Sequence, residues 1–198
     1  MDVWIRESRA RSLLTSAIEV YNRETDGVFL GKFVFRKIRG RRKRVLYVED
    51  AHPFQTAERK PSQVYHGNVS AFKRVMNSLT STDAEFIGGY HSHPFPYKGV
   101  RLSKYDVDFI KDQLKFIRRS EDFETQHKWV ELLMCIKRIR YKRKQETGWE
   151  YRGDRKRARF MLRISPFIAF EIILAAFWID FTKAKPEVFE AGVHIPKE

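Results

Sequence analysis

The clearest indication of metal chemistry in this chain is a pair of histidines, His91 and His93, separated by one residue. They follow a β-like run, and Pro94 comes directly after them. Side chains at positions i and i+2 of a strand point to the same face, so both imidazoles can converge on one ion. Because proline cannot continue a central strand, the pair is expected at the strand's end. A catalytic zinc ion would also need a third protein ligand and an open position for water.

The segment from Leu102 to Asp106 can supply that third ligand. A helix that begins at Ser103 presents Asp106 in its first turn, on the same side as the hydroxyl of Ser103. The same two residues also fit an ordinary N-terminal capping box, a purely structural interpretation that stays open. Asp108 is the nearest competitor as a ligand, but it lies two residues further on and therefore on a different helix face.

The order H-x-H-P, loop, S-x-x-D resembles the JAMM metalloprotease signature of MPN-domain proteins. That family also carries a glutamate just before a strand of the form E-x-x-G-x-x-x-G, and the segment from Glu24 to Gly31 fits this form. The similarity covers roughly residues 8 to 140. The loop 95–102 is longer than in the best-known eukaryotic relatives, so the substrate groove is expected to have its own shape.

The resemblance implies a set of roles for these residues. His91, His93 and Asp106 are expected to bind one zinc ion per chain. Glu24 is expected to act as general base and then as general acid, and Ser103 to donate a hydrogen bond to the developing oxyanion. No covalent intermediate is needed, in agreement with the lack of a plausible cysteine nucleophile.

The implied activity is that of a zinc-dependent isopeptidase similar to the deubiquitinases. Its substrates would be conjugates in which the C-terminus of a ubiquitin-like, β-grasp modifier is joined to a lysine. The short chain looks most like the stand-alone archaeal and bacterial members. The modifier's extended tail is expected beside an exposed strand edge near Gly88 and the loop 95–102. Two alternatives remain: a JAMM hydrolase of small amides or peptides, and a non-catalytic MPN scaffold.

Hydrophobic periodicity predicts the elements that position these residues. Residues 8–22, 69–79 and a segment beginning at Ser103 are expected to be helices. Strands are expected at 28–36, 45–49, 85–93, 129–139, 158–164 and 170–181, the last favoured over a helix by its aromatic and isoleucine content. Gly40 marks a hairpin turn, residues 51–63 a polar loop, and residues 142–156 a hairpin tip or insert.

Interleaved helices and strands predict one α/β or α+β domain over residues 1–198. The resemblance implies an MPN-type domain, with a mixed central sheet flanked by helices as in cytidine deaminases. The catalytic core is expected at about 8–140, and strands within 141–198 are expected to complete the sheet.

The composition excludes several classes of protein. Hydrophobic residues make up 42% of the chain, enough for a substantial core. The single cysteine, Cys135, excludes a disulfide framework and a cysteine-based zinc site, and is expected to be a small buried hydrophobe. The longest apolar stretch, 167–179, is too short to span a bilayer, and the N-terminus lacks the apolar core of a signal peptide. We therefore expect a soluble cytoplasmic protein with no membrane contact.

The formal net charge of +14 favours acidic partners. Eighteen of the 39 lysine and arginine residues fall in three runs, 36–44, 137–144 and 152–159, each at or beside an expected hairpin tip. These runs are either solvated charge, a docking surface for an acidic protein, or a weak nucleic-acid contact. Tyr141, Trp149 and Tyr151 lie among them and could stack on bases. The remaining histidines, at positions 52, 66, 127 and 194, are expected to be incidental or at the surface.

Overall fold

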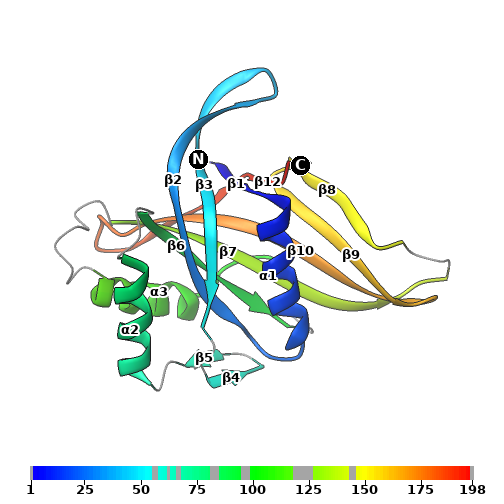
Figure 1. Cartoon of the computed structure of the whole chain (residues 1–198), viewed down its shortest axis with the longest axis horizontal. Helices are drawn as coiled ribbons and strands as arrows, with labels where there is room; N and C mark the ends of the chain where they lie inside the picture. The colour runs from blue at the N-terminus through cyan, green and yellow to red at the C-terminus, as the bar shows by residue number, and fades with distance from the viewer. Residues whose placement is uncertain are drawn as a thin grey trace.

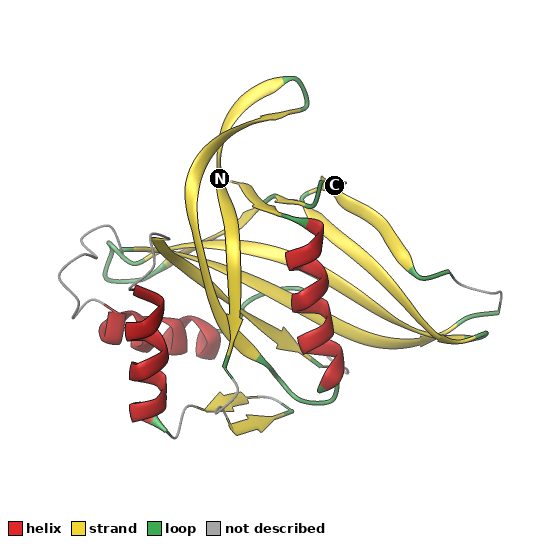
Figure 2. Ribbon diagram, in the orientation of Figure 1, coloured by secondary structure: helices red, strands yellow, loops and turns green. Residues whose placement is uncertain are grey.

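A computed structural model describes residues 2–54, 58–61, 63–65, 68–80, 85–94, 99–117, 127–142 and 146–196 of the chain. The helices are α1 (Glu7–Glu19), α2 (Val69–Thr80) and α3 (Lys104–Ile117). The strands are β1 (Asp2–Ile5), β2 (Asp26–Ile38), β3 (Arg41–Pro53), β4 (Glu58–Lys60), β5 (Gln63–Tyr65), β6 (Glu85–His93), β7 (Lys128–Arg140), β8 (Gly148–Arg155), β9 (Arg157–Ser165), β10 (Ile168–Asp180), β11 (Glu187–Ala191) and β12 (Val193–His194). The fold is mixed α+β and dominated by strands, as Figures 1 and 2 show.

Ten of these strands form one mixed sheet in the order β12-β1-β3-β2-β6-β7-β10-β9-β8, with β11 paired to β10. The pairs β1–β12, β1–β3 and β6–β7 are parallel, and the other pairs are antiparallel. Strands β4 and β5 make a separate small hairpin. The sheet is strongly curled, and its edge strand β12 approaches the β8–β9 turn, where Val193 N–H donates to the carbonyl oxygen of Lys156 at 2.9 Å.

Side chains alternate across a strand, so the sheet places apolar residues on both of its faces. Helices cover each face and bury these residues. On one face, α1 packs through an apolar stripe that includes Leu13, Leu14 and Ala17, against a core that contains Phe29. On the other face, α2 and α3 pack over a core to which β2 contributes its neighbour Val28. Figure 2 shows α1 crossing the sheet apart from α2 and α3, which lie together. Tyr90, the residue before His91 on β6, packs in the core on the α1 side of the sheet. Because side chains alternate along a strand, His91 and His93 lie on the opposite side, where α3 packs.

The structure confirms the expected helices and the strand at 170–181, which is β10. The hairpin turn at Gly40 is also confirmed. Arg39 and Gly40 both have positive φ, 49° and 77°, which is the type I′ geometry that joins two twisted antiparallel strands. Helix α1 ends at Glu19 rather than at residue 22.

Several expectations about loops and edges are wrong. Residues 51–63 are not one loop, because β3 continues to Pro53 and β4 and β5 follow. The segment 142–156 contains a full strand, β8, and its turn lies at Lys156, whose φ is 67°. Strands β1, β11 and β12 were not expected at all. Their short and partly polar sequences carry little alternation, and long-range pairing alone makes them strands.

The expected exposed strand edge near Gly88 is also absent, since β6 lies inside the sheet between β2 and β7. Gly88 faces Phe29 on one side and Val130 on the other. A Cβ atom at Gly88 would overlap the carbonyl oxygen of Val130, so only glycine permits this close approach. None of the helices among the described residues is long and apolar enough to cross a bilayer.

Candidate metal centre

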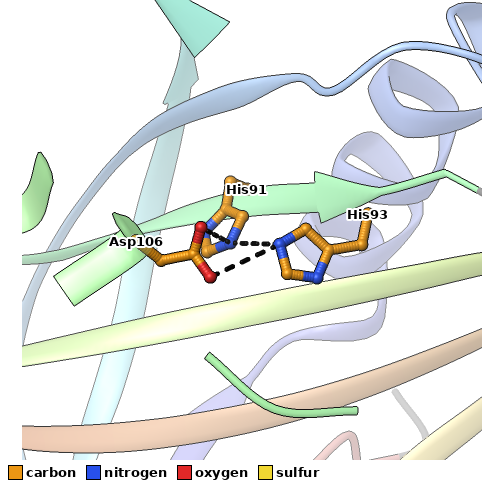
Figure 3. Close-up of side chains that lie close together, drawn as sticks. All are labelled: His91, His93 and Asp106. Carbon is orange, nitrogen blue, oxygen red and sulfur yellow. Dashed lines mark hydrogen bonds and ion pairs between the residues drawn. The ribbon is translucent and has the colours of Figure 1, made fainter. Parts of the chain in front are cut away.

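His91, His93 and Asp106 come together on the α3 side of the sheet, as Figure 3 shows. One ligand atom from each lies within 4.8 Å of the others. The two Nε2 atoms are 3.0 Å apart, and Asp106 lies 3.9 Å from His91 Nε2 through Oδ1 and 3.6 Å from His93 Nε2 through Oδ2. His91 and His93 are 8% and 1% exposed. The three residues predicted as ligands from sequence therefore form one buried cluster.

Asp106 is held in place by the first turn of α3. The Ser103 N–H donates to Asp106 Oδ2 at 2.6 Å, and the Asp106 N–H donates to Ser103 Oγ at 3.1 Å. These reciprocal bonds are a capping box, so the structural interpretation of the two residues is confirmed. It does not exclude a metal site, because the carboxylate still faces both histidines. Asp108 is exposed and does not belong to the cluster.

Glu131 completes the centre and was not anticipated from the sequence. It lies on β7, beside β6, and is 3% exposed. His91 Nδ1 lies 2.6 Å from Glu131 Oε1, and Trp129 Nε1 donates to Glu131 Oε2 at 2.6 Å. Carboxylates that accept a hydrogen bond from the far nitrogen of a histidine are typical of metal sites, where they fix the tautomer and the orientation of the ring. The signal was a lone carboxylate inside the apolar run WVELLMCI.

Glu24 is placed beside the cluster by the main chain around it. Ser92, between the two histidines, accepts a hydrogen bond from Thr25 N–H through Oγ at 3.0 Å and donates its own N–H to the Thr25 carbonyl at 2.8 Å. The Glu24 N–H donates to the carbonyl oxygen of Lys60 at 2.9 Å. Glu24 is only 6% exposed. The end of β6 and the start of β2 thus fix the predicted base next to the predicted ligands.

A small cavity of about 20 Å³ lies between these groups and is lined by Glu24, His91, Asp106, Glu131 and Tyr105, among others. A single water molecule needs a cavity of roughly this size and two or more polar partners. The cavity therefore has both the room and the polar groups for one water molecule within reach of a base.

The electrostatics of the cluster follow from burial and proximity. Burial raises the pKa of Glu24 to about 7, with Asp106 and Asp26 adding to the effect and His91 opposing it. Burial alone would lower the pKa of His91, but the hydrogen bond and charge of Glu131, with help from Asp106 and Glu24, raise it to about 9. Burial would likewise raise the pKa of Asp106, yet the two histidines and the Ser103 N–H lower it to about 2. Asp106 is therefore ionised at neutral pH.

The donor set fits zinc. Two imidazoles and one carboxylate are the ligands of known catalytic zinc sites, which leave the fourth position to water or substrate. The Glu131 bond to His91 Nδ1 leaves His91 Nε2, which faces the cluster, as the nitrogen available to a metal ion. A soft-metal site is not supported, because burial raises the pKa of the Cys135 thiol to about 12 and Cys135 lies outside the cluster.

His194, expected to be incidental or at the surface, has a side chain that is 17% exposed, and its Nε2 lies 3.2 Å from Oδ2 of Asp2. The run 36–44 forms the tip of the β2–β3 hairpin, as expected. His66 and the residues 95–98 of the expected substrate loop lie outside the described residues.

No family model and no curated protein matches this chain. Among solved structures, the solution structure of protein DSY2949 from Desulfitobacterium hafniense is similar, with a TM-score of 0.54 and 13% sequence identity over 99% of this chain and 94% of that one. At this identity the likeness concerns the fold alone. It supports a mixed α+β fold for the whole length of the chain.

Proposed function

We propose that this protein is a zinc-dependent metalloisopeptidase of the JAMM/MPN+ class, which hydrolyses the amide bond between the C-terminus of a ubiquitin-like modifier and a lysine. One observation carries the proposal: His91, His93 and Asp106 form a buried cluster beside Glu24, around a cavity the size of one water molecule. The three residues of the cluster are the three ligands that the motif implies, which supports the proposal.

The roles of the residues follow from their positions. A zinc ion held by His91, His93 and Asp106 would supply Lewis acidity, which acidifies a coordinated water and polarises an amide carbonyl. Glu24 lines the same cavity and would take the proton of the attacking water, then pass it to the leaving amine nitrogen. In the zinc-free protein burial raises the pKa of Glu24 to about 7, so the carboxyl group can exchange a proton near neutral pH.

Ser103 would stabilise the oxyanion that develops during attack. Its Oγ accepts the N–H of Asp106, which fixes the oxygen and leaves the hydroxyl hydrogen to donate to another group. A donor held in place before the reaction costs no reorganisation when charge develops. The capping role and the catalytic role of Ser103 therefore support each other.

The cavity at the cluster is too small to enclose an amide substrate of any kind. Pockets that enclose small ligands measure about 300–1,000 Å³, whereas the cavity at the cluster measures about 20 Å³. A scissile bond would have to be delivered from outside, by a substrate bound over a wider surface. Tyr105 lines the cavity and is 49% exposed, so it offers an aromatic contact at the entrance.

Cleavage of a panel of lysine-linked conjugates, with ubiquitin and β-grasp modifiers and a short amide peptide, tests the proposal. We expect cleavage of a protein conjugate, loss of cleavage with a zinc chelator, and recovery when zinc is restored. Cleavage of the short peptide alone would identify an amide hydrolase instead. Failure to cleave any substrate, by protein that holds no zinc, would favour a scaffold.

A further inference from the structure

A second cavity, of about 570 Å³, lies away from the metal centre, where the curled sheet brings its two ends together. Its lining includes Trp4, Lys37, Arg39, Trp149, Tyr151 and His194. These residues come from β1, the tip of the β2–β3 hairpin, β8 and the C-terminal segment from β12 onward. We refer to this cavity as the aromatic cleft. Its volume lies in the range of pockets that bind small molecules or single nucleotide units.

Aromatic rings form much of its lining. Trp4 and His194 are directly paired in the parallel β1–β12 ladder, with ring centroids 6.1 Å apart. From the other side, β8 contributes Trp149 and Tyr151. The phenol of Tyr151 accepts a hydrogen bond from Arg159 at 3.1 Å, and Trp149 packs edge-on against Phe160. Neighbouring side chains therefore hold the rings in position, with part of each ring accessible.

Positive charge is concentrated beside the rings. From Lys32 to Arg44 the β2–β3 hairpin carries eight basic residues and no acidic one. At its tip, Lys37 and Arg39 are exposed and line the cleft. Figure 1 shows the hairpin projecting beyond the rest of the sheet. One acidic residue, Glu150, also lines the cleft; it forms an ion pair at 2.7 Å with Arg159, which is shared with Glu171. The cleft thus presents a net positive rim.

We propose that the aromatic cleft binds single-stranded nucleic acid, with one or more bases stacked on its rings and the backbone phosphates on Lys37 and Arg39. Stacking on aromatic side chains combined with a basic track is the way in which proteins hold single strands without reading sequence. A duplex is disfavoured, because its bases are already stacked and would not enter a cleft of this size. An acidic protein would use the cations but would gain little from four aromatic rings.

This site is separate from the metal centre. Asp26, at the start of β2, is paired with His91, whereas the cleft begins at Lys37, near the other end of the same strand. Eleven residues of strand place the two sites up to about 35 Å apart. Variants of the hairpin tip should therefore leave zinc binding unchanged, and the inference does not depend on the proposed activity.

Fluorescence anisotropy with a labelled oligothymidylate of about 12 nucleotides, at several salt concentrations, tests the inference. For single strands, log affinity falls with log salt by about 0.7 for each phosphate contact. Replacing Lys37→Gln together with Arg39→Asn should reduce that slope by about 1.4. Asn-Gly suits a type I′ turn, so Arg39→Asn preserves the hairpin. The matched control, Lys73→Gln with Arg74→Gln on α2, removes the same charge at exposed positions and should leave the slope unchanged.

A second comparison isolates the stacking. An abasic oligonucleotide of the same length carries the same phosphates and should bind at least about tenfold more weakly. Equal binding of the abasic strand, or an equal effect of the cleft and control variants, would overturn the inference. Tighter binding of polyglutamate than of the oligonucleotide would also overturn it and assign the surface to an acidic protein.

Discussion

His91 Nδ1 lies 2.6 Å from Oε1 of Glu131, and this contact decides which ring nitrogen of His91 faces the other ligands. Because Nδ1 is occupied, Nε2 points toward His93 and Asp106. Glu131 is in turn held by the indole N–H of Trp129. Such a buried support would orient His91 for a metal ion before the ion binds.

Glu131→Gln should weaken zinc binding by about 10- to 100-fold, the usual cost of losing an outer partner of a ligand. An amide has one acceptor, so Gln cannot accept from both His91 and Trp129, and one donor is left unpaired. Competition with a chromophoric zinc chelator measures the affinity. Glu19→Gln, at an exposed position at the end of α1, is the control. Unchanged zinc affinity in folded Glu131→Gln protein would remove Glu131 from the centre.

Asp106→Asn and Asp108→Asn separate the predicted ligand from its neighbour on α3. The amide oxygen of Asn can still accept the Ser103 N–H, so the helix start should survive the first substitution. We expect Asp106→Asn to lower zinc affinity more than about 100-fold, because a ligand contributes more than an outer partner does. Asp108→Asn should have no effect. If both variants bound zinc as tightly as the unmodified protein, Asp106 would not be a ligand.

Glu24→Gln should retain zinc and lose at least about 10²-fold in the rate of conjugate cleavage, since the base is removed and the ligands are not. The same variant has a stability signature in zinc-free protein. The folded-state pKa of Glu24 is raised from 4.5 to about 7, so the carboxylate destabilises the fold as pH rises through that interval. At pH 8 the variant should therefore have a Tm a few degrees above that of the unmodified protein. Near-full activity of Glu24→Gln would exclude Glu24 as the base.

Zinc binding should release a proton at neutral pH. In the zinc-free protein Glu131 and its neighbours raise the pKa of His91 to about 9, so His91 is protonated until the metal displaces the proton. Affinity should then rise by about tenfold per pH unit between pH 6 and 8. Calorimetry in buffers with different ionisation enthalpies counts the protons. Binding that neither releases protons nor changes with pH would show that zinc is bound elsewhere.

Local spacing aligns each part of the cluster. His91 and His93 lie two residues apart on one strand, and Asp106 lies three residues after the helix-capping Ser103. That the two parts meet was expected from the resemblance of the whole motif, and the structure brings the three residues together. The strands β2, β6, β7 and β10 were predicted for a similar reason, because long alternating or apolar runs indicate strands without knowledge of their partners. Both kinds of signal depend on residues that are close in the sequence.

What could not be predicted depends on residues distant in the sequence. Glu131 reaches His91 across 40 positions, through the parallel pairing of β6 with β7. The local sequence predicts a strand at Gly88 whether that strand lies at the centre or at the edge of the sheet. Only the order of the strands shows that it lies at the centre. The aromatic cleft needs the curl that brings β12 to the β8–β9 turn, so that Trp4 and Trp149 line one cavity.

Zinc K-edge X-ray absorption on protein loaded with one equivalent of zinc tests the central claim most directly. We expect a four-coordinate ion with two imidazole nitrogens and light-atom ligands at about 2.0–2.2 Å, and loss of one imidazole in His91→Ala. A sulfur ligand at about 2.3 Å, or a spectrum unchanged by His91→Ala, would contradict a zinc site formed by His91, His93 and Asp106.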